Sequence, residues 1–159
     1  MFILGIDPSL RSTGWAIVTR LEELCLYTKS GVIITSSAQD YTTRLSVLYN
    51  GISNILKDFA PGLVVMEQTF VNANPMSSLI LAMARGAMMA AVGNAKVRMI
   101  ESSPNTIKQN FTGHGKATKA QMRLMASTLF HLDGEVLDHN QIDALAAAYT
   151  GYLEYKVDS

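Results

Sequence analysis

Two acidic residues of the chain each follow an apolar segment, at the point where a buried strand would end. Asp7 closes the segment FILGID, and Glu67 closes the segment LVVME. If these strands are neighbours, the carboxylates lie side by side at one edge of a sheet, where α/β proteins tend to place their sites. Like charges held close together repel one another unless a cation neutralises them, and oxygen ligands favour Mg²⁺ or Mn²⁺. The two acids therefore predict a site for a divalent cation.

A third acid, Asp143, lies in the first turns of the predicted last helix, within the segment HNQIDALAAAY. The residues that follow it include Ala144 and the run Ala146–Ala148, so this helix could pack tightly on the sheet. Tight packing would bring Asp143 to the other two acids. An exposed acid is also favoured near a helix N-terminus on electrostatic grounds, so that interpretation of Asp143 stays open.

Basic residues are concentrated between positions 96 and 123, whereas acids dominate from position 131 onward. The basic stretch holds six Lys or Arg residues and one acid: Lys96, Arg98, Lys108, Lys116, Lys119, Arg123 and Glu101. A basic stretch beside an acidic one suits a surface that holds phosphates next to a metal-binding cluster. Gly113 and Gly115, in TGHGKA, would let backbone amides approach a phosphate closely. Ordinary solvated helix faces and a plain turn would give the same pattern.

The hydrophobic pattern predicts the elements that would position these side chains. Apolar runs bounded by turn residues favour strands, and apolar residues at helical spacing favour helices. Strands are expected at 2–7, 14–19, 24–35, 63–68 and 97–100, and helices at about 45–59, 75–94, 103–110, 117–131 and 140–155. This order of elements is typical of an α/β fold with a mixed five-stranded sheet flanked by helices.

The long helix expected at 75–95 is dense in alanine and methionine and is apolar nearly all round. One sheet cannot bury so wide an apolar surface. We therefore expect the helix to pack against a second copy of the chain, and the alternative is a wholly internal helix.

Composition limits the class of protein. The chain has 159 residues, 48% of them hydrophobic and 16% charged, and its net charge is zero, which suits one packed domain over 1–159. No segment reaches the ~18 to 20 uninterrupted apolar residues of a membrane span, so we expect no membrane association. The N-terminus lacks the features of a signal peptide, and the single cysteine, Cys25, suits a reducing compartment. These features predict a cytoplasmic protein.

Four segments of the chain resemble a known family. They are GIDPSLRSTGWAIV, VVMEQTFVNANPMSSLILAMARGA, IKQNFTGHGKATKAQM and IDALAAA, which together span about residues 2–150. In this order they are similar to the motifs of RuvC, the bacterial Holliday junction resolvase family. The resemblance implies the RNase H-like fold of the retroviral integrase superfamily and a homodimer packed through the helix at 75–95. It also implies paired nicking of four-way junction DNA that depends on Mg²⁺, with two ions per active site and Mn²⁺ as an expected substitute. A branch-migration partner is possible, and the sequence does not identify it.

The resemblance also implies roles for individual residues. Asp7, Glu67 and Asp143 match three of the four metal-binding acids of the family. Lys108 and Lys119 match its two functional lysines. In the implied mechanism Lys119 neutralises charge that grows on the scissile phosphate, and Lys108 holds a neighbouring phosphate, leaving 5′-phosphate and 3′-hydroxyl ends.

The DNA-binding surface is expected to include further residues. Phe70 matches the aromatic residue that is thought to wedge at the centre of the junction, although a phenylalanine is more often part of a core. Lys116 and Arg123 belong to the basic stretch and are expected to contact DNA as well. The alternative is that these basic residues are ordinary solvent-exposed side chains without a role in binding.

One position departs from the family pattern. Asn140 stands where the family has an acid or a histidine, three residues before the last Asp. Its amide oxygen can ligate Mg²⁺ but brings no charge. We favour Asn140 as a weak fourth ligand, with His139 or Asp138 as the alternatives. The departure leaves open a second function, a junction-binding dimer that cleaves weakly or not at all.

Overall fold

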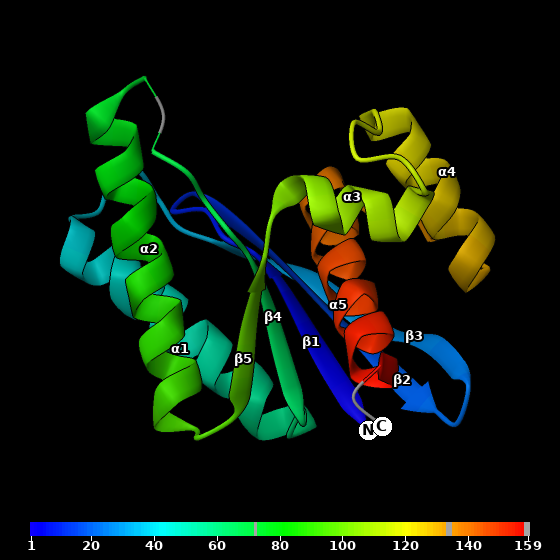
Figure 1. Cartoon of the computed structure of the whole chain (residues 1–159). Coiled ribbons are helices and arrows are strands. Elements are labelled where there is room, and N and C mark those ends of the chain that lie inside the picture. The colour runs from blue at the N-terminus through cyan, green and yellow to red at the C-terminus, as the bar shows by residue number, and fades with distance from the viewer. Residues whose placement is uncertain (72, 133–134, 158–159) are drawn as a thin grey trace.

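The structure is a computed structural model that describes residues 1–71, 73–132 and 135–157. Ten elements follow one another in the order that the sequence predicts (Figure 1). They are β1 (Phe2–Asp7), β2 (Ser12–Leu21), β3 (Leu24–Ile34), α1 (Tyr41–Phe59), β4 (Leu63–Glu67), α2 (Pro75–Asn94), β5 (Arg98–Ser102), α3 (Pro104–Thr112), α4 (Lys119–Phe130) and α5 (His139–Val157).

The five strands form one mixed sheet in the order β3-β2-β1-β4-β5. β1 pairs with β2 and β2 with β3 in antiparallel fashion, whereas β4 runs parallel to both β1 and β5. The predicted α/β fold with a mixed five-stranded sheet is therefore confirmed. The parallel β1–β4 pair brings the carboxyl ends of two central strands to the same edge of the sheet, so the condition set for the two acids is met.

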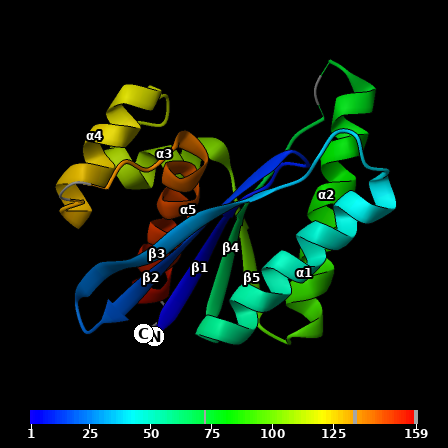
Figure 2. The same cartoon turned by 180° about the vertical axis from the view of Figure 1, so that it is seen from behind.

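Helices cover both faces of the sheet. Helices α1 and α2 lie on one face, and α3, α4 and α5 lie on the other (Figures 1 and 2). Alternate residues of β1 and β4 supply the two cores: Leu4 and Val64 pack with α1 and α2, whereas Ile3 and Val65 pack with α5. This alternation decides which face each side chain at a strand end reaches.

Helix α2 keeps an exposed apolar surface. Ala84, Met88 and Val92 are buried against α1 and the sheet, while Met76 and Leu79 are 60% and 55% exposed. Within the part of the chain that the structure describes, α2 is the one helix long and apolar enough to span a membrane by length and composition. A helix packed on the core of a globular protein meets the same criterion, and α2 is not wholly internal.

Candidate active site

Asp7 and Glu67 occupy the last positions of β1 and β4 and point toward the same face of the sheet. The two strands pair in parallel with Ile6 opposite Met66, so the acids are the next residue along each strand. Ile6 and Met66 are buried in the core on the side of α1 and α2. Because successive side chains of a strand alternate between faces, the two acids point to the other side, toward α5.

Helix α5 rests directly on the strands beside these acids. A Cβ atom added to Gly5 would lie 2.0 Å from the carbonyl oxygen of Ala144, and one added to Gly14 would lie 2.0 Å from the carbonyl oxygen of Asn140. Only glycine allows so close an approach of the helix backbone. Asp143 lies between these two contact points on the first turns of α5. The small residues after Asp143 thus pack as the sequence predicted, and Asp143 joins the strand-end acids.

The carboxyl group of Asp7 is the most perturbed of the three. Burial raises its pKa from 3.8 to about 8, and the charges of Asp143, Glu67 and Asp138 add to the rise, in that order. Both causes disfavour the charged form of Asp7. In the absence of a cation, Asp7 therefore binds a proton near neutral pH.

The other two acids lie in a similar environment, which nearby basic side chains moderate. Burial raises the pKa of Glu67, the charge of Asp143 adds to the rise, and Lys108 opposes it. Burial also raises the pKa of Asp143, and His139, Lys108 and Lys119 oppose that rise. Both lysines singled out in the sequence therefore lie close enough to the acids to act on their charges.

Arg85 of α2 contacts the end of β4 from the face of the sheet opposite the acids. Its side chain is 10% exposed, and its guanidinium donates to the backbone carbonyl of Glu67 and forms an ion pair with Glu101 of β5. Glu101 lies opposite Met66 in the β4–β5 register, so it faces α2, whereas the Glu67 side chain faces α5. The positive charge of Arg85 also opposes the rise in the pKa of Glu67, which burial causes. One buried cation thus anchors the strand end that carries Glu67.

Asn140 and Asp138 both make structural contacts at the start of α5. The Asn140 amide donates to the hydroxyl of Ser12 at 3.1 Å. Asp138 accepts from the backbone N–H of Gln141 at 2.9 Å, and the Gln141 side chain accepts from the backbone N–H of Asp138 at 3.0 Å. Asp138 therefore caps α5, although its charge still acts on Asp7.

His139 points to a different part of the site. Helix α5 begins at His139, one residue earlier than expected, so His139 and Asp143 are one helical turn apart. Together with Lys119 and Arg123 they line a small cavity of about 130 Å³. Of the three candidates for a fourth ligand, His139 is the one that shares a cavity with Asp143 and a lysine.

Three residues of the expected DNA-binding surface are exposed. Phe70 follows β4 in an irregular segment and is 69% exposed, so it is not part of the core. Lys116 is exposed in the turn between α3 and α4. Arg123 is exposed on α4, where its guanidinium donates to the carbonyl of Leu137 at 3.3 Å.

The donor set suits a hard divalent cation, although the side chains do not surround a ready-made site. Among the residues that the structure describes, no three His, Cys, Asp or Glu side chains are arranged as metal ligands. Asp7, Glu67 and Asp143 nevertheless share one sheet edge, and burial raises the pKa of each. A cation with oxygen ligands would relieve this desolvation and mutual repulsion.

The sequence interpretation missed the contacts of Arg85 and Ser12. The signal for Arg85 was its position in the middle of an otherwise apolar helix, where a charged side chain needs a buried partner. The sequence could not identify that partner, because Glu101 is brought near only by the β4–β5 pairing.

Comparison with known proteins gives the family. Residues 3–151 match the family model of the crossover junction endodeoxyribonuclease RuvC. The RuvC of Rickettsia bellii is 40% identical over 150 residues, which cover 94% of this chain and 96% of the relative. The RuvC of Rickettsia conorii is 39% identical over the same coverage.

Solved structures agree with this assignment. A structure of Thermus thermophilus RuvC in complex with a Holliday junction superposes with a TM-score of 0.91 and 25% identity, covering 99% of this chain and 96% of that chain. A yeast mitochondrial Holliday junction resolvase shares the fold with a TM-score of 0.69 and 16% identity, covering 98% of this chain and 81% of that chain. The expected RNase H-like fold is thus confirmed. The site geometry, the family model and these relatives lead to one conclusion: the chain belongs to the RuvC family of crossover junction endodeoxyribonucleases.

Proposed function

We propose that this chain is a structure-selective endonuclease that resolves four-way DNA junctions by paired, symmetric nicks. One observation carries the proposal: three partly buried acids from β1, β4 and α5 meet at one sheet edge, and two lysines act on their charges. Such a site can bind cations and a phosphodiester together. Membership of the RuvC family supports a junction as the substrate. A reducing cytoplasm is the expected compartment for a chain whose one cysteine, Cys25, is a free thiol.

The acids would hold two Mg²⁺ ions, with Mn²⁺ as a substitute. Asp7 is central and would contact both ions, Glu67 would serve one ion, and Asp143 with Asn140 or His139 would serve the other. When bound, such ions activate water and stabilise the charge of the attacking and leaving oxygens of a phosphodiester.

The lysines would act on the DNA. Lys119 stands at the start of α4 beside Asp143, where its charge would offset the charge that develops on the scissile phosphate. Lys108 acts on the charges of both Glu67 and Asp143 and would hold the adjacent phosphate. Phe70, Lys116 and Arg123, which are all exposed, would contact the flanking DNA.

We further propose that two copies pack through α2. The exposed side of this helix combines apolar side chains with small residues at helical spacing: Met76, Leu79, Ala82, Gly86 and Met89. Small residues allow two helices to approach closely, and burial of the large ones would favour association. A twofold dimer would present two identical sites to a substrate that is itself roughly twofold symmetric.

A junction-binding dimer with weak cleavage is the second candidate, and the Asn140 contact favours it. The Asn140 amide is hydrogen-bonded to Ser12, and Asn140 brings no negative charge to the ions. If the fourth ligand were essential, junction binding would persist while nicking became slow.

The test is a nicking assay on a synthetic four-way junction, in Mg²⁺ and in Mn²⁺, with a linear duplex and a flap of the same sequence as competitors. We expect paired nicks in the junction and little cleavage of the other substrates. Asp7→Asn is the control and should abolish nicking while junction binding remains.

Asn140→Asp distinguishes the two candidates. If the wild type nicks and Asn140→Asp changes the rate only a few-fold, the endonuclease is supported. If the wild type binds junctions without cutting and Asn140→Asp cuts, the chain is a binding module. Absence of preferential junction binding by the wild type would overturn both.

A further inference from the structure

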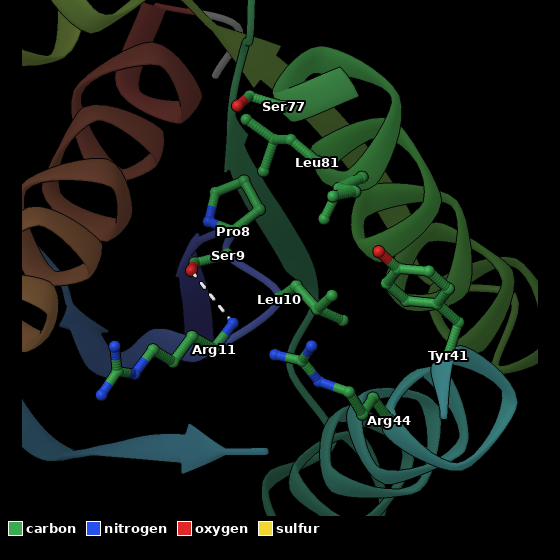
Figure 3. A pocket seen from close by; sticks show the side chains of 9 residues that line it. Pro8, Ser9, Leu10, Arg11, Tyr41, Arg44, Ser77 and Leu81 are labelled. Atoms are coloured by element: carbon green, nitrogen blue, oxygen red, sulfur yellow. Dashed lines mark hydrogen bonds between the residues drawn. The ribbon is translucent and has the colours of Figure 1, made fainter. Parts of the chain in front are cut away.

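A cavity lies at the same sheet edge as the acids, on the opposite face. It has a volume of about 430 Å³ and opens between the turn that follows β1 and the first turns of α1 and α2 (Figure 3). The apolar wall of the cavity is formed by Leu10, Ile80 and Leu81. Tyr41 projects from α1 toward α2. The assigned site residues do not line this cavity.

Two arginines give the cavity a positive charge. Arg11 comes from the turn and Arg44 from α1, and the nine lining residues include no acid. Among the described residues, neither arginine is within ion-pair distance of a carboxylate, whereas Arg85 is paired. Unpaired guanidinium groups on the two sides of the turn that borders a cavity without acids favour an anionic ligand.

Arg44 is held in place by a buried relay. Its Nε donates to the hydroxyl of Thr35 at 2.9 Å, and that hydroxyl donates to the carbonyl of Leu10 at 2.6 Å. Thr35 is 4% exposed, and its backbone N–H donates to the carbonyl of Arg11 at 3.0 Å. The relay fixes the Arg44 guanidinium against the turn with one of its donors, and the terminal amino groups are left for a ligand. A guanidinium held in this way loses little conformational entropy on binding.

The cavity is continuous with the candidate active site along the chain. Pro8, which follows Asp7 directly, lines the cavity, and Arg11 is four residues from Asp7, a span of at most about 14 Å. In Figure 3 Arg44 extends under Leu10, whereas Arg11 leaves the turn on the side away from α2. The two guanidinium groups therefore lie on either side of the turn that follows β1.

We propose that this cavity holds a nucleotide of the junction strand that runs on from the scissile phosphodiester. Arg11 and Arg44 would bind the phosphates on either side of the turn, and the sugar would lie against the apolar wall. The inference rests on the proposed junction-cleaving function, because it takes its ligand from that substrate. It adds a second contact surface on the α1 and α2 side of the sheet.

The first test measures how binding depends on salt. Binding of a labelled four-way junction is followed by fluorescence anisotropy between 50 and 200 mM salt, in an Asp7→Asn background so that the DNA stays uncut. We expect Arg11→Gln and Arg44→Gln each to weaken binding about five- to ten-fold and to reduce the slope of log K against log salt by about one. The matched control is Lys57→Gln, which removes an exposed cation from the far end of α1 and should change neither quantity.

The second test locates the contact on the DNA. Single neutral methylphosphonates are placed along the cut strand, and their effect is measured with and without Arg11→Gln or Arg44→Gln. At one position near the cut site, the methylphosphonate should weaken the parent protein about five-fold and leave the matching arginine variant nearly unaffected.

Three outcomes decide the proposal. The proposal is overturned if the salt slopes of the arginine variants equal that of Lys57→Gln. It is also overturned if the methylphosphonate and arginine effects add independently at every position. In either case, nicking of the junction by the wild type would leave the proposed function intact. Loss of junction preference in the wild type overturns the proposed function instead. If Arg44→Gln does not fold, Arg11→Gln and Arg44→Lys decide, because lysine keeps the charge and should keep the slope while it loses the hydrogen bond to Thr35.

Discussion

The carbonyl oxygen of Ala144 occupies the space that a side chain at Gly5 would need, with a Cβ-to-oxygen distance of 2.0 Å. Backbone lies against backbone at this point, so neither partner can move aside in the way that a flexible side chain can. The contact fixes α5, and with it Asp143, at the sheet edge where β1 ends.

Gly5→Ala should therefore both destabilise the protein and impair nicking. Overpacking of this kind costs about 1 to 3 kcal/mol, and displacement of α5 would move Asp143 away from Asp7. Thermal melting and the nicking rate at saturating Mg²⁺ measure the two effects. Gly93→Ala is the control, because a Cβ added there meets nothing within 4 Å. Normal nicking by a folded Gly5→Ala protein would contradict the assigned role of this contact.

The raised pKa of Asp7 predicts how stability depends on pH. The group has a pKa of about 8 in the folded protein and 3.8 as its ordinary value, so the folded state binds the extra proton between these limits. Without metal, this group should make the protein less stable as pH rises from about 4 to 8. Asp7→Asn removes the effect, and we expect it to raise stability by about 2 kcal/mol at pH 8 and by much less at pH 4.5.

Thermal melts in EDTA between pH 4.5 and pH 8.5 measure this difference, with Asp58→Asn as the control at an exposed site. Addition of Mg²⁺ at pH 8 should stabilise the wild type and not Asp7→Asn. A stability difference between wild type and Asp7→Asn that does not change with pH would show that Asp7 ionises freely.

The Arg85 anchor predicts a change in metal affinity as well as in stability. Arg85→Met leaves Glu101 and the Glu67 carbonyl without their partner and should cost about 1 to 3 kcal/mol. It should also raise the Mg²⁺ concentration for half-maximal nicking, because the strand end that carries Glu67 loses its anchor.

The double variant Arg85→Met/Glu101→Met separates these effects. Apolar replacement of both partners should recover much of the stability, since no charge stays unpaired. The Mg²⁺ requirement should stay raised, because the Glu67 carbonyl still lacks its donor. Recovery of both properties together would mean that Arg85 supports the fold alone.

The exposed side of α2 predicts a dimer that should dissociate when a single charged residue is introduced there. Leu79→Glu would place like charges near each other across a twofold interface without an opposite partner. We expect monomers in sedimentation at micromolar concentration, with melting nearly unchanged in dilute protein. Leu124→Glu is the control, because Leu124 is 69% exposed but lies on α4. Equal masses for wild type and Leu79→Glu would exclude this interface.

Much of the fold and part of the site could be predicted from the sequence. Apolar runs ending at Asp7 and Glu67 indicated two buried strands, and the order of elements indicated a mixed sheet. The parallel pairing of the two strands is given by the structure. The alternation of side chains then places both acids on one face. Local patterns suffice for these inferences because each depends on a few neighbouring residues.

The remaining features depend on how distant segments meet. Whether α5 includes His139 decides whether that side chain lies one helical turn from Asp143, and a boundary of one residue is beyond sequence patterns. The Arg85–Glu101 pair and the Thr35 relay join residues whose proximity is set by strand register. Hydrophobic periodicity carries no information on such contacts.

Arg85 joins the helix that would meet a second subunit to the strand end that carries Glu67. A small shift of α2 against the α2 helix of the second subunit would move Arg85, and through its hydrogen bond the peptide unit of Glu67. The residues that contact DNA would not need to move. Subunit association and magnesium affinity would then be linked equilibria, each strengthening the other by the same factor. Dilution alone should make the enzyme appear to need more magnesium, so metal titrations at different protein concentrations would not be interchangeable.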